Sequence, residues 1–140
     1  MAVSLTRVVG FCAMHRLHRL DWTDAENRAA FGSLSDPPGH THDYRCAVTV
    51  GGPVSPPMMM VMDLPLLDRI LDDEVVKPFD GKNINRDVPA FADGSTIPTC
   101  EAIAAHIFAR VAARLPEGVT LERVRVLEDA TLHADCFGPV

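Results

Sequence analysis

The sequence lacks any run of basic residues and any long apolar stretch, and each absence excludes a class of partner. Its 140 residues carry 13 lysines and arginines against 19 aspartates and glutamates, a formal net charge of −6. No basic stripe is available to follow a phosphate backbone, so nucleic acid is not an expected partner. The longest apolar run, Pro56–Met62, is about a third of the roughly 20 residues that a membrane-spanning helix needs. A membrane is therefore not an expected partner either.

The sequence also lacks paired cysteines. Cys12, Cys46, Cys100 and Cys136 lie 34, 54 and 36 residues apart, so no C-x-x-C pair exists from which a zinc ribbon or a thioredoxin-type motif is built. The N-terminal apolar stretch Val8–Met14 is short, and no small-residue cleavage site follows it. We therefore expect a cytoplasmic protein with reduced thiols. A disulfide framework in a secreted chain is the less favoured alternative.

The apolar material that is present suffices for one core. The composition is 47% hydrophobic and 23% charged, with a mean hydropathy of +0.08. These values are typical of a globular chain and not of a disordered one. No internal repeat or low-complexity tract interrupts the sequence, and its length predicts a single domain over residues 1–140.

Hydrophobic periodicity predicts strands at both ends of the chain and two helices between them. Apolar residues recur at every third or fourth position from Leu64 until Pro78, and at every fourth position from Ile103 to Leu115, with Pro98 as a first helical residue. The predicted strands are Thr6–Leu17, Tyr44–Val50, Met58–Met62, Leu121–Leu127 and Leu132–Phe137. This order predicts an α+β fold with a mostly antiparallel sheet and helices on one face.

The sharpest local motif is Gly39-His40-Thr41-His42-Asp43-Tyr44, at the entry to a predicted strand. A period of two puts His40 and His42 on the same face, where they could share a metal ion. An open zinc site needs a third protein ligand, and His15 is the best placed because its strand is expected to pair with this one. Taken alone, the H-x-H motif is more often a surface pair on a loop.

Seven ordered blocks of the sequence resemble the 6-pyruvoyl-tetrahydropterin synthase family, which shares its fold with the 6-carboxy-tetrahydropterin synthases of queuosine biosynthesis. The blocks are Phe11–Leu17, Gly39–Tyr44, Met60–Leu64, Lys77–Asn85, Asp87–Asp93, Pro98–Glu101 and Val124–Glu128. The resemblance implies a T-fold, an antiparallel four-stranded sheet with two helices on one face. It also implies that subunits join edge to edge into a barrel, most often as a homo-hexamer built from two trimers, with active sites between neighbours.

The same resemblance implies a ligand set. A zinc ion would be held by three histidines: His15, His40 and His42. Carboxylates at Glu101 and Glu128, with Thr99 nearby, would bind the pterin, because a carboxylate accepts two parallel N–H donors. Without the resemblance, Glu101 is equally explained as an acid in the first turn of a helix, and Glu128 as a turn residue.

The sequence departs from the family pattern at the catalytic base. Family members carry a cysteine shortly before the H-x-H motif, and its position corresponds to Leu34 on one spacing and to Asp36 on the shorter spacing of the queuosine enzymes. The family's Asp-His pair corresponds to Asp80 and Gly81. Asp36 and Asp80 are therefore the candidate replacement bases, with His133 as a further one, although Asp36 is also explained as an Asx turn.

These observations predict a function and a rival to it. The predicted function is a zinc-dependent, pterin-processing carbon–oxygen lyase, acting on 7,8-dihydroneopterin triphosphate or a close relative with altered base chemistry. The rival is a non-catalytic zinc and pterin binding protein used in sensing, delivery or regulation, since the binding site can survive loss of the base; an oligomeric scaffold with a degenerate site is a third hypothesis. A triphosphate would need local cations such as Arg16, Arg19 and Lys82, because the net charge offers no general attraction.

Overall fold

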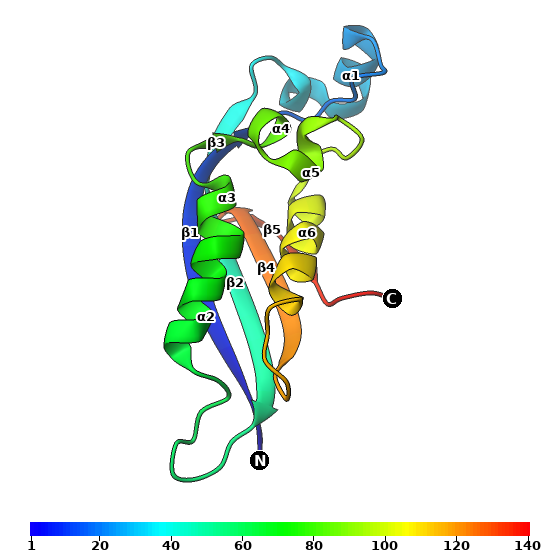
Figure 1. The fold of residues 1–140 in the computed structure, drawn as a ribbon. Coiled ribbons are helices and arrows are strands. Elements are labelled where there is room, and N and C mark those ends of the chain that lie inside the picture. Colours follow the sequence, from blue (N-terminus) through cyan, green and yellow to red (C-terminus); the bar gives the residue numbers. More distant parts are fainter.

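The computed structural model describes all of residues 1–140 and contains one five-stranded sheet (Figure 1). The strands are β1 (Ala2–His15), β2 (His40–Pro53), β3 (Lys82–Asn83), β4 (Thr120–Asp129) and β5 (Leu132–Cys136), in the order β3-β1-β2-β4-β5. The long β1–β2 pair is antiparallel and ends with His15 opposite His40. The β2–β4 and β4–β5 pairs are also antiparallel. By contrast, β3 runs parallel to β1 beside Ala13 and Met14.

Two expectations about the sheet are wrong. The sheet is five-stranded and mixed, not four-stranded and antiparallel, because the two residues of β3 add a short parallel strand at its edge. The strand expected at Met58–Met62 does not form, and these residues lie in the loop after β2. Pro56 and Pro57 have no N–H to donate to a ladder, and Met59 has a φ of +53°, which is not a strand conformation.

Two helical segments cover one face of the sheet, as predicted (Figure 1). Helix α2 (Leu64–Leu71) begins after Asp63, whose carboxylate accepts a hydrogen bond from the amide of Leu66. It continues through a π-helical turn (Asp72–Val76) into α3 (Lys77–Phe79). Pro78 therefore lies inside the last turn instead of ending the helix before it. The second helix, α6 (Cys100–Ala112), lies within the range expected from its four-residue spacing.

The core fills the space between this face of the sheet and the helices. Apolar side chains of the predicted helices are fully buried there, as expected from their spacing: Leu67, Leu71 and Val75 from the first, and Ile103, Ile107 and Val111 from the second. Inward-pointing strand residues such as Phe11, Val48 and Val126 pack against them. None of the helices has the length and apolar character needed to cross a bilayer.

The shorter helices gather at one end of the sheet (Figure 1). They are α1 (Asp24–Phe31), a 3₁₀ turn (Gly32–Ser35), α4 (Ile84–Asp87) and α5 (Pro89–Ala92). At this end β1 finishes and β2 begins, so the histidines of both strands lie beneath these connecting segments.

Candidate metal centre

Three histidines converge where β1 ends and β2 begins. The register places His15 opposite His40 and Ala13 opposite His42, so all three imidazoles project from neighbouring strands. One nitrogen of each ring lies within 4.8 Å of one nitrogen of each of the others, and the ring centroids are 4.5–5.1 Å apart. The structure thus brings together the three residues that the sequence singled out as metal ligands.

Gly39 makes this convergence possible. Its φ is +113°, and a Cβ atom there would lie 2.5 Å from the backbone oxygen of His15. Such a contact is far inside van der Waals separation, and such a φ is rarely adopted by residues with a side chain. Glycine therefore lets the first residue of β2 approach the last residue of β1.

A hydrogen bond to the backbone fixes the tautomer of His15. The ring is 1% exposed, and its Nδ1 lies 2.7 Å from the carbonyl oxygen of Pro98, just before α6. A carbonyl only accepts, so Nδ1 carries the proton and Nε2 presents its lone pair to the cluster. Burial, together with the neighbouring His40 and His42 and against the opposing effect of the Pro98 hydrogen bond, lowers the pKa of His15 to about 4. His15 is neutral at pH 7, the form that binds metal.

The polar atoms around the cluster favour a bound cation. The Nε2 atoms of His15 and His42 are buried and have no hydrogen-bond partner. The nearest acid is Glu128, whose Oε1 lies 3.3 Å from Nε2 of His15 and 3.8 Å from Nε2 of His42. A lone pair facing a carboxylate is unfavourable unless a positive charge lies between them. Neutral imidazoles suit zinc among other transition metals, so these residues fit the metal that the resemblance implies.

The expected pterin-binding residues flank the cluster. Burial raises the pKa of Glu128, with His42 opposing and the acids Asp129 and Glu101 adding to the effect. Glu101 lies in the first turn of α6, and the Thr99 hydroxyl caps that helix by accepting a hydrogen bond from the amide of Ala102 at 3.1 Å. The segment from Pro98 to Glu101 therefore orients His15 and presents an acid from adjoining positions.

The candidate bases do not face the histidines within one chain. The carboxylate of Asp36 pairs with Arg28, and Leu34 is partly exposed on the same loop. Asp80 accepts a hydrogen bond from the backbone amide of Cys12 at 2.9 Å. Because strand residues alternate, the side chain of Cys12 lies on the side of the sheet opposite His15, and Asp80 lies beside β1 between α3 and β3. His133 is on β5, with its Nε2 3.9 Å from Asp135.

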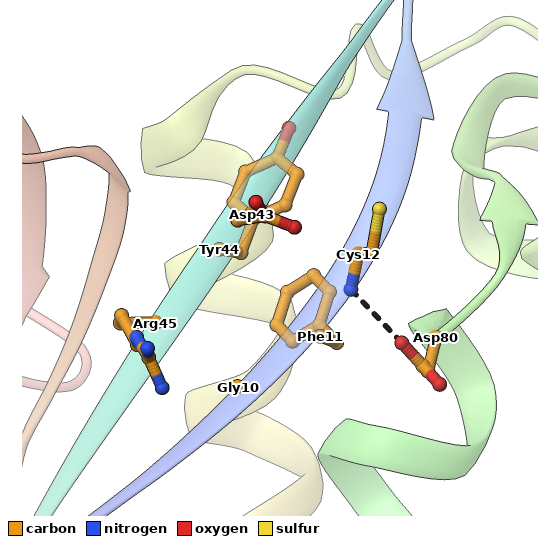
Figure 2. A pocket seen from close by; sticks show the side chains of 7 residues that line it. All are labelled: Gly10, Phe11, Cys12, Asp43, Tyr44, Arg45 and Asp80. Carbon is orange, nitrogen blue, oxygen red and sulfur yellow. Dashed lines mark hydrogen bonds between the residues drawn. The ribbon is translucent and has the colours of Figure 1, made fainter.

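Asp80 instead lines a separate pocket of about 410 Å³ on that opposite side (Figure 2). Cys12, Asp43 and Arg45 also line this pocket. The neighbouring Gly81 has a φ of +73°, and a Cβ atom there would meet open space. Its amide donates a 2.7 Å hydrogen bond to the carbonyl of Cys12. A side chain at this position would have room, but the positive φ would strain most residues other than glycine.

Sequence reasoning missed two contributors to the site. The carbonyl of Pro98 orients His15, and no sequence pattern marks a backbone acceptor 83 positions away. Tyr44 is 1% exposed and presents its ring edge-on to His15 and His42, with centroids 5.9 and 5.4 Å apart. A signal for Tyr44 existed, since it follows His42 by two residues and must share its face.

Comparison with known proteins finds one family over nearly the whole chain. The family model described as 6-pyruvoyl tetrahydropterin synthase matches residues 4–139. The 6-pyruvoyl tetrahydrobiopterin synthases of Poecilia reticulata and Homo sapiens are 40% and 39% identical over 89% of this chain, covering 82% and 83% of those proteins. The solved structure of Caenorhabditis elegans 6-pyruvoyl tetrahydropterin synthase superposes with a TM-score of 0.91 at 30% identity, over 99% of this chain and 97% of that one.

Proposed function

Because the chain belongs to the 6-pyruvoyl tetrahydropterin synthase family, we propose that it is a zinc-dependent, pterin-processing lyase with an altered base. Its substrate would be 7,8-dihydroneopterin triphosphate or a close relative. One observation carries the proposal: three histidines converge, and the buried Nε2 atoms of two of them, His15 and His42, have no hydrogen-bond partner and lie beside the carboxylate of Glu128. The T-fold of the family is the fold seen here.

The residues of the chain divide the chemistry between them. His15, His40 and His42 would hold zinc, which when bound acidifies a coordinated hydroxyl and polarises a carbonyl. Glu128 would accept the pterin's parallel N–H donors, and Glu101 and Thr99 would complete that end of the site. The elimination of triphosphate also needs a group that takes a proton from the substrate's side chain.

Assembly bears on where that group comes from. On the side away from β2, β1 pairs with β3 only at Ala13 and Met14, so the rest of this edge is unpaired. The outer edge of β5, at the other end of the sheet, is also unpaired. Open edges favour pairing with further chains, so a hexamer of two trimers, with each chain a single domain, would satisfy them. Asp80 would then act on the substrate of a neighbouring copy, whereas Asp36 would first have to leave Arg28.

A second function is favoured by a specific observation. Leu34 and Gly81 stand where the family has its cysteine and histidine, and no candidate base faces the cluster in one chain. A protein that binds zinc and pterin without turnover, for sensing, delivery or regulation, needs only the histidines and carboxylates. The two functions differ in whether product forms.

Product analysis separates them. Zinc-loaded protein is incubated with dihydroneopterin triphosphate and, separately, with dihydroneopterin, and products are identified by mass spectrometry. From the triphosphate we expect triphosphate release and a modified pterin, both lost in His42→Ala. Loss of product in Asp80→Asn but not in Asp36→Asn would assign the base to Asp80. Bound but unchanged substrate would reject the lyase and establish the binding function.

A further inference from the structure

Tyr44 carries a hydroxyl group that the free protein leaves without a partner. Its Oη is fully buried and forms no hydrogen bond. The ring cannot turn away, because it stacks on Phe11 at a centroid distance of 4.9 Å and is bounded by His15 and His42. A buried, unsatisfied donor destabilises the fold, and native structures seldom keep one without a purpose. The hydroxyl therefore has no acceptor in the arrangement that the side chains adopt here.

Glu128 is the acceptor within reach. Arg45 is paired with Leu127 across β2 and β4, so the next step of the register sets Tyr44 opposite Glu128, with both side chains on the inner face. Cross-strand neighbours of this kind have Cβ atoms about 4.5–5.5 Å apart. A phenol keeps its proton at neutral pH, so the Tyr44 hydroxyl can donate to the Glu128 carboxylate.

The other polar groups near the Tyr44 hydroxyl already have partners, and Glu128 itself faces the histidines. The Cys100 thiol, which also lies near Tyr44, donates to the carbonyl of Val126 at 3.1 Å. In the ligand-free chain Glu128 turns one oxygen toward the ring nitrogens of His15 and His42. A ligand with N–H donors would draw the carboxylate away from the histidines, and because each carboxylate oxygen has two lone pairs, one oxygen could accept from both the ligand and Tyr44.

We propose that Tyr44 is a positioning residue, whose hydroxyl donates a hydrogen bond to Glu128 when a pterin occupies the site and so holds that carboxylate toward the ligand. The inference rests on the proposed function, because it assumes that Glu128 binds the pterin. On this proposal, the unpaired hydroxyl destabilises the free protein, and the hydrogen bond formed on pterin binding removes that destabilisation.

The chain contains one tyrosine, which allows a direct test. Protein labelled with ¹³C at the tyrosine Cζ is loaded with zinc and titrated with 7,8-dihydroneopterin, while calorimetry gives the affinity. We expect the single Cζ resonance to shift on saturation, as a phenol that becomes a donor requires. Tyr44→Phe should bind the pterin about tenfold more weakly, the loss expected for one hydrogen bond to a charged group. Its zinc content should be unchanged.

Thermal unfolding of the free protein separates positioning from a structural role. Tyr44→Phe should unfold at an equal or higher temperature than the wild type, because it removes only an unsatisfied donor. The matched control is Thr49→Val on the same strand as Tyr44, β2. It removes a buried hydroxyl that is hydrogen-bonded at 2.7 Å to the hydroxyl of Thr6 on β1. That variant should unfold earlier and bind pterin normally.

Four outcomes would overturn the inference. Pterin that binds without moving the Cζ resonance, or that binds Tyr44→Phe as tightly as wild type, shows that the hydroxyl plays no part. A lower unfolding temperature for Tyr44→Phe shows a structural role. Absence of calorimetric binding to the wild type rejects the proposed function, and the inference falls with it.

Discussion

Replacing Gly39 by alanine tests whether the close approach of β1 and β2 builds the metal centre. The new Cβ would lie 2.5 Å from the oxygen and 3.0 Å from the carbon of the His15 carbonyl group, both backbone atoms that have little freedom to move. The φ of +113° adds strain of about 1–3 kcal/mol for a residue with a side chain. The strands must therefore separate, which moves His40 away from His15.

The expected effects follow from these contacts. For a chain of this length, a loss of about 1–3 kcal/mol lowers the unfolding temperature by roughly 3–10 °C. Moving one ligand out of place should weaken zinc binding by about 10-fold to 100-fold, the size seen when the surroundings of metal ligands are disturbed. Competition with a chromophoric chelator measures the affinity, and calorimetry measures the unfolding temperature.

Gly118→Ala is the matched control for Gly39→Ala. Gly118 also has a positive φ, +86°, but its added Cβ would meet no atom within 4 Å. It should cost backbone strain alone and leave zinc affinity unchanged. If both variants bound zinc with the wild-type affinity, the steric account of the metal centre would be wrong.

Two further predictions concern the packing beneath the site. Arg110 makes two hydrogen bonds, of 3.1 and 3.4 Å, to Glu74, which is only 8% exposed. Arg110→Met should destabilise the fold by about 1–2 kcal/mol in urea unfolding, because a buried carboxylate loses its main partner. A smaller loss than that of the control Arg7→Met, at the exposed ion pair with Asp68, would refute this prediction. Burial, and then Arg110, lower the pKa of His106 against the effect of Glu74, so its protonation costs more in the folded than in the unfolded chain. Its contribution is complete above the unfolded pKa of about 6.5 and is lost as the pH falls toward the lower folded value; His106→Gln should flatten this acid-side loss, and an unchanged pH profile would contradict the assignment.

Most of the correct predictions about the site came from the two-residue alternation of side chains along a strand. Alternation put His40 and His42 on one face, and the pairing of the first two long strands brought His15 to them. The helix spacing likewise identified the buried positions of α2 and α6. These features are local or follow from neighbouring elements, so they depend little on the rest of the fold.

The features that escaped prediction depend on distant contacts. The parallel strand β3 has two residues, Lys82 and Asn83, too few for any pattern. The five apolar residues Met58–Met62 matched a strand by composition, but Met59 has a positive φ and the sheet does not include these residues. The orientation of His15 depends on a carbonyl oxygen, an atom that every residue has. Side-chain pattern alone carries no information on which carbonyl will be used.

The two faces of the sheet separate the two proposed functions. The three histidines and Glu128 lie on the inner face with the helices, whereas Asp80 bonds to the backbone amide of Cys12 and lines the separate pocket that Cys12, Asp43 and Arg45 share. The proposed zinc ligands and Glu128 all belong to the inner face of one chain. Proton transfer by Asp80 would need a second copy that brings Asp80 to the substrate held by the first. A lyase that uses Asp80 therefore requires assembly, and a monomer that still retained zinc and pterin would be expected to bind without turnover.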